Sequence, residues 1–565
     1  MVQVSLFVLA AAAFVLAVFL LEAYRAKQAE KRFIRSLYED CERLAEKEYA
    51  PERFAKIGSY FWRHPSPNQL DDITWNDLGM DELFKRMNYT LSASGEEYLY
   101  YTLRTLKQDE EELLHLEDAV RFFEGNPDER VKVQLQMHKL GYTGKFSLYD
   151  YLDNLDYLGD RSNRKSILQN LLFLPLICLL WVNFPVGVVG LMILIVYNIT
   201  TYFKEKNEID PYITSFAYIM RLLSVCDEVE KNRIQVLSRE WEQIHLHKKN
   251  LQAMRRNSFW VMDPARGQAS GNVLEVFLDY IRMVFHVDLL RFNSMLKHLR
   301  NHIEDVDVLL GTLGFLETSI AVGIFRKSLT RGYCLPELEE QNIFHMEEGY
   351  HPLLSEPVKN SIRTERGVLL TGSNASGKST FLKTVAINAI FAQTIHTCAA
   401  DRFHSTFYHV YSSMALRDDL GAGESYYIVE IKALKRILDA AQTGGRVLCF
   451  VDEVLRGTNT VERIAASAQI LKSLCAAQIL CFAATHDIEL TKLLRHDYDN
   501  YHFSEDVKEN DVVFDYKLQS GEATTRNAIR LLELMGYDHE IIEKAYRQAE
   551  NFVATGRWER VSHEH

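Results

Sequence analysis

The stretch that decides the fold is Thr371-Gly372-Ser373-Asn374-Ala375-Ser376-Gly377-Lys378-Ser379-Thr380. It contains the full GxxxxGK[ST] pattern, follows the apolar run Val368–Leu370 and precedes the helix-like segment Phe381–Thr394. A strand, a glycine-rich loop and a helix in this order form a phosphate cradle, because the loop N–H groups and the helix N-terminus face the phosphates. The complete motif and its flanks disfavour the alternative, a glycine turn that only looks like such a loop.

The motif also predicts individual roles. Lys378 is expected to reach the β and γ phosphates, and the hydroxyl of Ser379 to ligate Mg²⁺. The other loop residues expected to contact the nucleotide are Gly372, Ser373, Asn374, Ala375, Ser376, Gly377 and Thr380. The predicted cofactors are therefore ATP and Mg²⁺.

Two further apolar runs end in residues suited to nucleotide hydrolysis. Val447–Val451 is followed by Asp452, which is placed to hold Mg²⁺, and by Glu453, which is placed to polarise the attacking water. Ile479–Ala484 leads into Thr485 and His486, and a histidine at the carboxyl end of a parallel strand faces the ligand crevice. Without the upstream loop these would be surface acids and a capping histidine.

Length and charge bound the remaining choices. The 565 residues suffice for about three or four domains, and the formal net charge of -13 gives no global basic footprint for nucleic acid. The eight cysteines are scattered without a CxxC pair, which argues against a zinc site or a disulfide framework.

Two apolar regions predict membrane contact. Val2–Leu21 carries no charge and is long enough to cross a bilayer as a helix. Basic residues such as Arg25, Lys27 and Lys31 follow this run, whereas a cleaved signal peptide carries them before it. The same asymmetry predicts an external N-terminus and a cytoplasmic remainder.

The second apolar region, Ile167–Ile199, is interrupted by Asn183-Phe184-Pro185-Val186-Gly187. It is too long for one crossing, and basic residues flank both ends, so we expect a helical hairpin of two short passes. The first arm, Ile167–Val182, is also short enough for a shallow re-entrant dip. A hairpin buried in a soluble core is the competing interpretation.

A small basic cluster lies in a helical region between Asp210 and His302. A solvated helix face is the preferred interpretation, and a lipid-facing or DNA-facing patch remains an alternative. The cluster consists of His245, His247, Lys248, Lys249, Arg255 and Arg256.

Four motifs in order resemble the ATPase domain of the MutS family. They are the loop with Asn374 in it, DDLGAGESYYIVE at 418–430, VDEVLRGTNT at 451–460 and FAATHDIEL at 482–490. The segments LFKRMN at 83–88 and SGEEYL at 94–99 resemble the start of that family's helical core, and 305–334 resembles its end.

The resemblance implies an ABC-type ATPase that dimerises with two composite sites. Ser425 would then act in trans on the partner's nucleotide, with Gly457-Thr458-Asn459 at the dimer seam, and Tyr516 would stack on adenine. The implied partners are a second copy of the chain, the membrane and, as an alternative, DNA.

The predicted organisation is an N-terminal transmembrane helix (1–23), a linker (24–70), an all-α lever domain (71–340) interrupted by the hairpin (167–201), and an α/β P-loop ATPase domain (341–565). The family's mismatch-recognition and connector domains are not expected before the core. The first hypothesis is a membrane-anchored ATPase with moving lever helices, and the second is a membrane-tethered DNA binder in repair or recombination.

Overall fold

The computed structural model describes residues 21, 24–25, 27–39, 47–144, 147–231, 234–256, 258, 261, 273–340, 343–373, 376–414, 426–442, 444–455, 459–476, 478–508, 511–522, 529, 532–533 and 535–559. The predicted N-terminal transmembrane helix (1–23) lies outside these residues, apart from Leu21.

The chain forms two compact units. The first comprises 1–65, 87–101 and 117–325, and the second comprises 66–86, 102–116 and 326–565. Tertiary packing therefore assigns two short segments before residue 117 to the unit that contains the glycine-rich loop.

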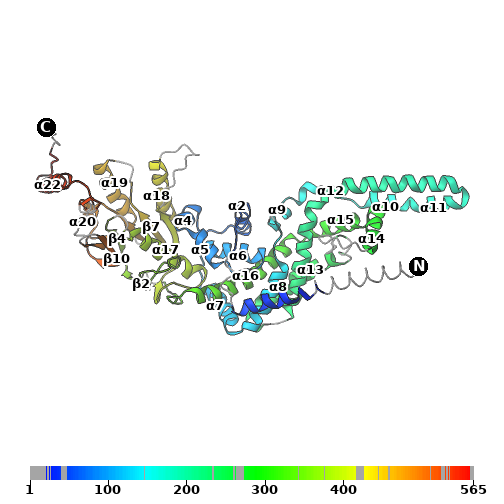
Figure 1. The fold of residues 1–565 in the computed structure, drawn as a ribbon, viewed down its shortest axis with the longest axis horizontal. Helices are drawn as coiled ribbons and strands as arrows, with labels where there is room; N and C mark the ends of the chain where they lie inside the picture. Colours follow the sequence, from blue (N-terminus) through cyan, green and yellow to red (C-terminus); the bar gives the residue numbers. More distant parts are fainter. Residues whose placement is uncertain are drawn as a thin grey trace, which may run out of the picture. The chain divides into compact units, whose positions relative to one another are not determined.

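The first unit is helical (Figure 1). Helices α6 and α7 begin or end in the second unit, and α16 ends there. Its elements are α2 (Pro51–Phe54), α3 (Ser59–Arg63), α6 (Ala93–Arg104), α7 (Glu110–Gly125), α8 (Pro127–Leu140), α9 (Leu148–Asp153), the 3-10 helix η2 (Leu155–Leu158), α10 (Arg164–Leu171), α11 (Phe173–Val182), α12 (Phe184–Glu230), the 3-10 helix η3 (Gln235–Leu237), α13 (Ser238–Arg255), α14 (Val273–Phe285), α15 (Val287–Arg300) and α16 (Ile303–Ser328).

Helices α10 and α11 fold back along α12 as the expected helical hairpin (Figure 1). The turn is at Asn183, whose side chain caps the N–H of Val186. Two glycines allow a close approach, because a Cβ on Gly187 or on Gly190 would lie 2.8 Å from a Leu180 or Leu176 side chain. The second arm does not end near Ile199. Helix α12 has 47 residues in all and runs from Phe184 through Pro211 to Glu230.

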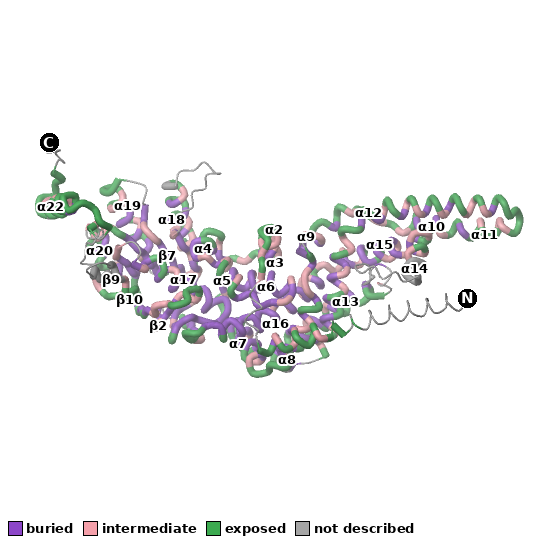
Figure 2. Tube along the Cα trace, viewed as in Figure 1, coloured by how far each residue is buried: buried purple, intermediate pink, exposed green. Residues whose placement is uncertain are grey.

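The hairpin is exposed, which excludes a buried soluble hairpin (Figure 2). Only 17% of the apolar window of 164–182 and 22% of that of α12 is buried inside the protein. Both helices are long and apolar enough to cross a membrane. The exposed apolar side chains are Ile167, Leu168, Leu171, Leu172, Leu174, Ile177, Trp181, Val182, Phe184, Val186, Val189, Met192, Ile193, Val196, Tyr197 and Phe203.

Polar side chains join the base of the hairpin to α14 and α15. The amide of Asn198 donates to the Val284 carbonyl at 2.8 Å. Tyr202 and Lys206, both on α12, contact the buried carboxylate of Asp288 at 2.8 and 3.2 Å. These bonds fix the arm of the hairpin to the helices that follow it.

Part of the basic cluster pairs with acidic side chains within the unit, while Lys249 and Arg256 are exposed. Lys248 is buried and pairs with Asp227 and Glu230, and Arg255 also pairs with Asp227. Partial burial acts to raise the pKa of the Asp305 carboxyl, but hydrogen bonds with Asn250, His247 and His302 hold that pKa below its usual value. The paired side chains are therefore committed to internal partners.

Helix α16 is a core helix, although its length and composition would also suit a membrane. In it 89% of the apolar window is buried. Its Glu317 lies in the interior and accepts hydrogen bonds from the N–H groups of Leu91 and Ser92 and from the Ser92 hydroxyl, which fixes the turn before α6.

The second unit contains two sheets. The larger has the strand order β10-β9-β4-β8-β7-β6, parallel from β9 to β6 with β10 antiparallel at the edge. The smaller, β1-β5-β2-β3, is mainly antiparallel and was not expected from the sequence. The elements are α4 (Asp72–Asp77), α5 (Met80–Met87), β1 (Glu337–Leu338), β2 (Phe344–Gly349), β3 (Asn360–Thr364), β4 (Gly367–Thr371), α17 (Lys378–Thr394), β5 (Arg402–Ser405), β6 (His409–Ser413), α18 (Tyr426–Gln442), β7 (Val447–Asp452), α19 (Thr460–Ser473), β8 (Ile479–Ala484), α20 (Glu489–Leu493), β9 (Tyr498–Lys508), β10 (Asp511–Ser520) and α22 (His539–Thr555).

The central strands are apolar throughout because both faces of the larger sheet are covered. Every residue of β4 and β8 is buried, as are the first five of β7. Phe450 and Phe482 stack on adjacent strands with ring centroids 5.4 Å apart. This rigid core presents the carboxyl ends of β4, β7 and β8 at one edge of the sheet.

Candidate active site

The glycine-rich loop connects β4 to α17 as the sequence predicts. Gly372 and Gly377 have φ of +146° and +106°, which favour glycine. A Cβ on Gly372 would lie 3.0 Å from the Phe503 carbonyl oxygen, so the loop is also sterically restricted there. The loop therefore curls tightly and directs the N-terminus of α17 toward the space above it.

Lys378, the first residue of α17, folds back over the loop. Its ammonium donates to the carbonyls of Gly372 at 2.8 Å and Ser373 at 2.7 Å. The side chain is largely buried, with 6% of the residue exposed. The cation is thus held above the loop, where a phosphate group would lie.

Ser379 and Asp452 meet as expected for a magnesium site. The Ser379 hydroxyl donates to the Asp452 carboxylate at 2.5 Å, joining the start of α17 to the end of β7. The Ser376 hydroxyl beneath is buried and has no hydrogen-bond partner. Oxygen donors and an unsatisfied hydroxyl fit a nucleotide phosphate with Mg²⁺. Within the described ranges, no group of three or more His, Cys, Asp or Glu side chains could hold a metal ion.

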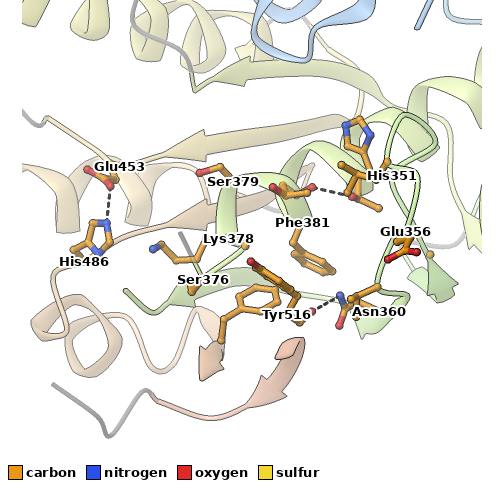
Figure 3. Close-up of a pocket in the computed structure, with 17 residues that line it drawn as sticks. His351, Glu356, Asn360, Ser376, Lys378, Ser379, Phe381, Glu453, His486 and Tyr516 are labelled. Carbon is orange, nitrogen blue, oxygen red and sulfur yellow. Dashed lines mark hydrogen bonds and ion pairs between the residues drawn. The ribbon is translucent and has the colours of Figure 1, made fainter. Parts of the chain in front are cut away.

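Glu453 and His486 face each other across the ends of β7 and β8 (Figure 3). The imidazole Nε2 lies 2.8 Å from a Glu453 carboxylate oxygen. Glu453 has φ of +61°, a strained conformation for a residue with a side chain, and its N–H donates to the Ala484 carbonyl at 2.9 Å. The strained backbone thus places the carboxylate between the two strands.

The turn with His486 is held by a partner that sequence reasoning missed. Arg463 on α19 makes two hydrogen bonds with the carboxylate of Asp487, at 3.0 and 2.6 Å. The N–H of Asp487 donates to the Thr485 hydroxyl at 3.0 Å. Two-point Arg–carboxylate contacts are directional, so Arg463 orients the histidine beside it.

A cavity of about 550 Å³ is lined by Lys378, Ser379, Glu453 and His486, among others (Figure 3). That volume falls in the range of small-molecule and cofactor sites. The lining residues are Gly349, His351, Leu354, Glu356, Val358, Asn360, Ser376, Gly377, Lys378, Ser379, Thr380, Phe381, Thr384, Glu453, His486, Phe503 and Tyr516. The cavity thus contains polar groups at the loop and apolar groups around His351 and Tyr516.

No sequence motif includes His351, yet it lines this cavity. Burial, and to a lesser extent the charge of Lys383, lowers the pKa of His351 to about 4. Its Nδ1 accepts from the N–H of Leu353 at 3.3 Å, so the ring proton is on Nε2. A neutral imidazole with one donor therefore faces the cavity at neutral pH.

Tyr516 also lines the cavity, and Gly377 lies directly beneath it. A Cβ on Gly377 would lie 3.1 Å from the Tyr516 ring. Tyr516 has φ of +53° and sits where the β9–β10 register shifts. Asn360 supports this irregular backbone by donating to the Tyr516 carbonyl at 2.9 Å and accepting from the Leu518 N–H at 2.8 Å.

Several predicted residues cannot be placed. Asn374, Ala375, Ser425, Gly457 and Thr458 lie outside the described residues. The helix after Ser425, α18, is nevertheless linked to the end of β7, because the buried Glu430 carboxylate accepts from the Leu455 N–H. Asn459 caps α19 by accepting from the Val461 N–H at 3.1 Å.

No local sequence pattern marked Asn360, Phe381 or Phe503 as cavity residues. Asn360 lies at the start of β3 and Phe503 within β9, and only the packing of the two sheets brings them to the loop. A proline after His351 was the only local mark.

Comparison with known proteins identifies the region around this cavity. Residues 368–553 match the family model of MutS domain V. The chain is 30% identical over 259 residues to the DNA mismatch repair protein MutS of Clostridium kluyveri, covering 43% of this chain and 29% of that protein. The MutS proteins of Natronomonas pharaonis and Thermus thermophilus are 31% and 28% identical over 226 and 234 residues, covering 38% and 40% of this chain and 26% and 28% of theirs. The chain thus spans less than a third of the length of these relatives.

Proposed function

We propose that this chain, whose residues 368–553 match MutS domain V, is a membrane-anchored, MutS-like ATPase. In this proposal ATP drives dimerisation, and hydrolysis moves lever helices that are connected to the hairpin. The observation that carries the proposal is the convergence of Lys378, the Ser379–Asp452 pair and the Glu453–His486 pair around one cavity.

Each residue has a distinct role in the proposed hydrolysis. The Lys378 ammonium would exchange its two carbonyl partners for phosphate oxygens, and Ser379 and Asp452 would hold Mg²⁺. Mg²⁺, when bound, neutralises the charge that develops on the phosphates. Glu453 would accept the proton of the attacking water, and His486 would orient that carboxylate and contact the γ-phosphate.

The test of this assignment is ATP turnover of Glu453→Gln beside Glu462→Gln. The first removes the proposed base, and the second neutralises an exposed carboxylate on α19. We expect Glu453→Gln to lose at least about 100-fold in turnover, to keep nucleotide binding and to accumulate ATP-bound dimers measurable by light scattering. Turnover within a few-fold of the parent for Glu453→Gln would refute the assignment.

Dimerisation would complete the site with Ser425 of a second copy. This part of the proposal is tested by mixing Lys378→Ala chains, which cannot hold phosphate, with Ser425→Ala chains. Composite sites predict partial recovery of turnover in mixed dimers, since some sites then carry an intact loop and an intact serine. A mixture that is no more active than its two components would refute action in trans.

The hairpin is proposed to insert into the bilayer from the cytoplasmic side. Its apolar side chains have no cover within the described parts of the chain, and basic residues lie at its base. Ile193→Cys and Leu246→Cys form a matched pair, because both positions carry exposed apolar side chains, on the hairpin and on α13. In membrane vesicles we expect a water-soluble maleimide to label Leu246→Cys and to spare Ile193→Cys. Equal labelling rates would place the hairpin in water and refute insertion.

The motion is proposed to pass through α16. Residues 303–325 of this continuous helix belong to the first unit and residues 326–328 to the second. Arg326 donates to the Thr397 hydroxyl at 2.9 Å and to the His396 carbonyl at 3.0 Å, just beyond the end of α17. The end of α16 is therefore hydrogen-bonded to the segment that follows α17, the helix that begins at the glycine-rich loop.

DNA binding is the second candidate, since the relatives are named as DNA mismatch repair proteins. Against it stand the net charge of -13 and the internal pairing of Lys248 and Arg255. This candidate predicts salt-sensitive DNA affinity and DNA-stimulated turnover. Turnover in lipid, with and without duplex or branched DNA, separates the two candidates.

A further inference from the structure

A second polar cavity lies at the base of the hairpin, within the first unit. Its volume is about 320 Å³. The lining residues come from the segment before α10, from α10, from α12 and from α15: Leu158, Arg161, Ser162, Lys165, Thr201, Lys204, Glu205, Glu208 and Asn293. No sequence motif and no family match covers these residues, because the matched domain begins at residue 368.

The cavity is located where the exposed apolar surface ends. Lys165 lies two residues before Ile167, the first exposed apolar residue of the first arm. Lys204 directly follows Phe203, the last exposed apolar residue of the second arm, whose side chain is 48% exposed. If the hairpin inserts, as proposed above, both lysines lie at the level of the lipid headgroups.

The cations of the cavity are only partly neutralised. Arg161 pairs with Glu208, and Lys165 approaches Glu205 at 3.4 Å. Lys204 makes no ion pair with any described residue. The Nε of Arg161 is buried without a hydrogen-bond partner, although its Nη2 donates to the Glu208 carboxylate. A buried, unsatisfied guanidinium N–H in a cavity with excess positive charge indicates a missing anionic acceptor.

We propose that this cavity binds the phosphate of an anionic phospholipid headgroup. Arg161 would donate its unsatisfied Nε–H, and Lys165 and Lys204 would supply charge. Basic pockets between membrane helices on the cytoplasmic side bind such headgroups in other proteins. The proposal rests on the insertion of the hairpin, and it adds a lipid specificity that insertion alone does not give.

The test is native mass spectrometry of the full chain in detergent, titrated with phosphatidylglycerol or with phosphatidylcholine. We expect at least fivefold stronger retention of phosphatidylglycerol, and at least a threefold loss of that retention in Lys204→Gln. The matched control is Arg164→Gln, which removes the same charge from an exposed neighbour that does not line the cavity. It should stay within twofold of the parent.

Three outcomes would overturn the proposal. Equal retention of the two lipids removes the headgroup specificity, and equal losses in Lys204→Gln and Arg164→Gln indicate general surface charge. Displacement of bound phosphatidylglycerol by millimolar inorganic phosphate, with phosphate itself bound, would assign the cavity to a free anion instead. Maleimide protection of Ile193→Cys is measured in parallel, so that loss of insertion is distinguished from loss of the headgroup site.

Discussion

The two cavities are proposed to bind phosphate by opposite means. At the glycine-rich loop the backbone curls, a helix N-terminus points at the ligand, and carboxylates take part because a metal ion is expected between them and the phosphate. At the base of the hairpin only side-chain cations are available, and the carboxylates of Glu205 and Glu208 compete with the ligand. The difference indicates that a carboxylate such as Asp452 can serve a phosphate site by holding a metal ion, whereas a carboxylate without a metal ion competes with the ligand for the cations.

The largest expected effect follows from this contrast. Asp452→Asn keeps the size of the side chain and removes the charge that Mg²⁺ requires. We expect Mg²⁺-dependent turnover to fall by about 100-fold to 1000-fold. Titration of turnover with Mg²⁺ checks this, and Asp439→Asn, an exposed acid on α18, is the control. An unchanged Mg²⁺ dependence of turnover would show that Asp452 does not hold Mg²⁺, and the two cavities would then no longer differ in how their carboxylates act.

A smaller effect is expected at Asn360, which supports the irregular backbone of Tyr516. Asn360→Ala leaves the Tyr516 carbonyl and the Leu518 N–H without that partner. Losing such bonds costs about 1–3 kcal/mol. We therefore expect the KM for ATP to rise about tenfold with little change in kcat, as measured by steady-state kinetics. A change in kcat alone would show that Tyr516 does not position the nucleotide.

At the base of the hairpin, removal of a carboxylate should have the opposite sign to the effect at Asp452. Glu208→Gln frees Arg161 from its ion pair and lowers the negative charge of the cavity. We expect retention of phosphatidylglycerol to rise about threefold while ATP turnover stays within twofold. The same lipid titration checks this, and weaker retention would mean that Glu208 orients Arg161 for the ligand rather than competing with it.

The smallest effect concerns acid. Since the folded pKa of His351 is lowered to about 4 from an ordinary value of 6.5, its contribution to stability is present above pH 6.5 and is lost as the pH falls toward 4. The loss is on the order of 2 kcal/mol. Urea unfolding at several pH values should show this loss in the parent and less of it in His351→Gln. No histidine is among the described residues that line the cavity at the hairpin, so phosphatidylglycerol retention there should not follow this profile.

A cavity residue could be predicted from the sequence when it directly followed a strand that the sequence also predicted. The loop, the acids after β7 and the histidine after β8 carry their own flanking strands, so Lys378, Ser379, Asp452, Glu453 and His486 could be named in advance. Asn360, in contrast, lies at the start of β3 in the smaller sheet, and no pattern in the sequence predicted that sheet.

Hydropathy alone likewise could not tell the exposed helices of the hairpin from the buried helix α16. The exposed hairpin and the buried α16 both satisfy the length and composition of a membrane span, yet 89% of the apolar window of α16 is buried. Composition records how apolar a helix is, while the surrounding chain decides what covers it. The end of α12 was likewise unpredictable, because no cap or charge near Ile199 stops the helix and Pro211 is tolerated inside it.

The length of α12 has a mechanical meaning. At 47 residues it extends about 70 Å, and the arm of the hairpin and the helix packed against α13 and α15 are one uninterrupted rod. Because the helix is continuous, a rotation of one end about the helix axis is transmitted to the other end. Pro211, which lacks an N–H and so omits one rung of the helix, is the point at which such torque would be relieved first.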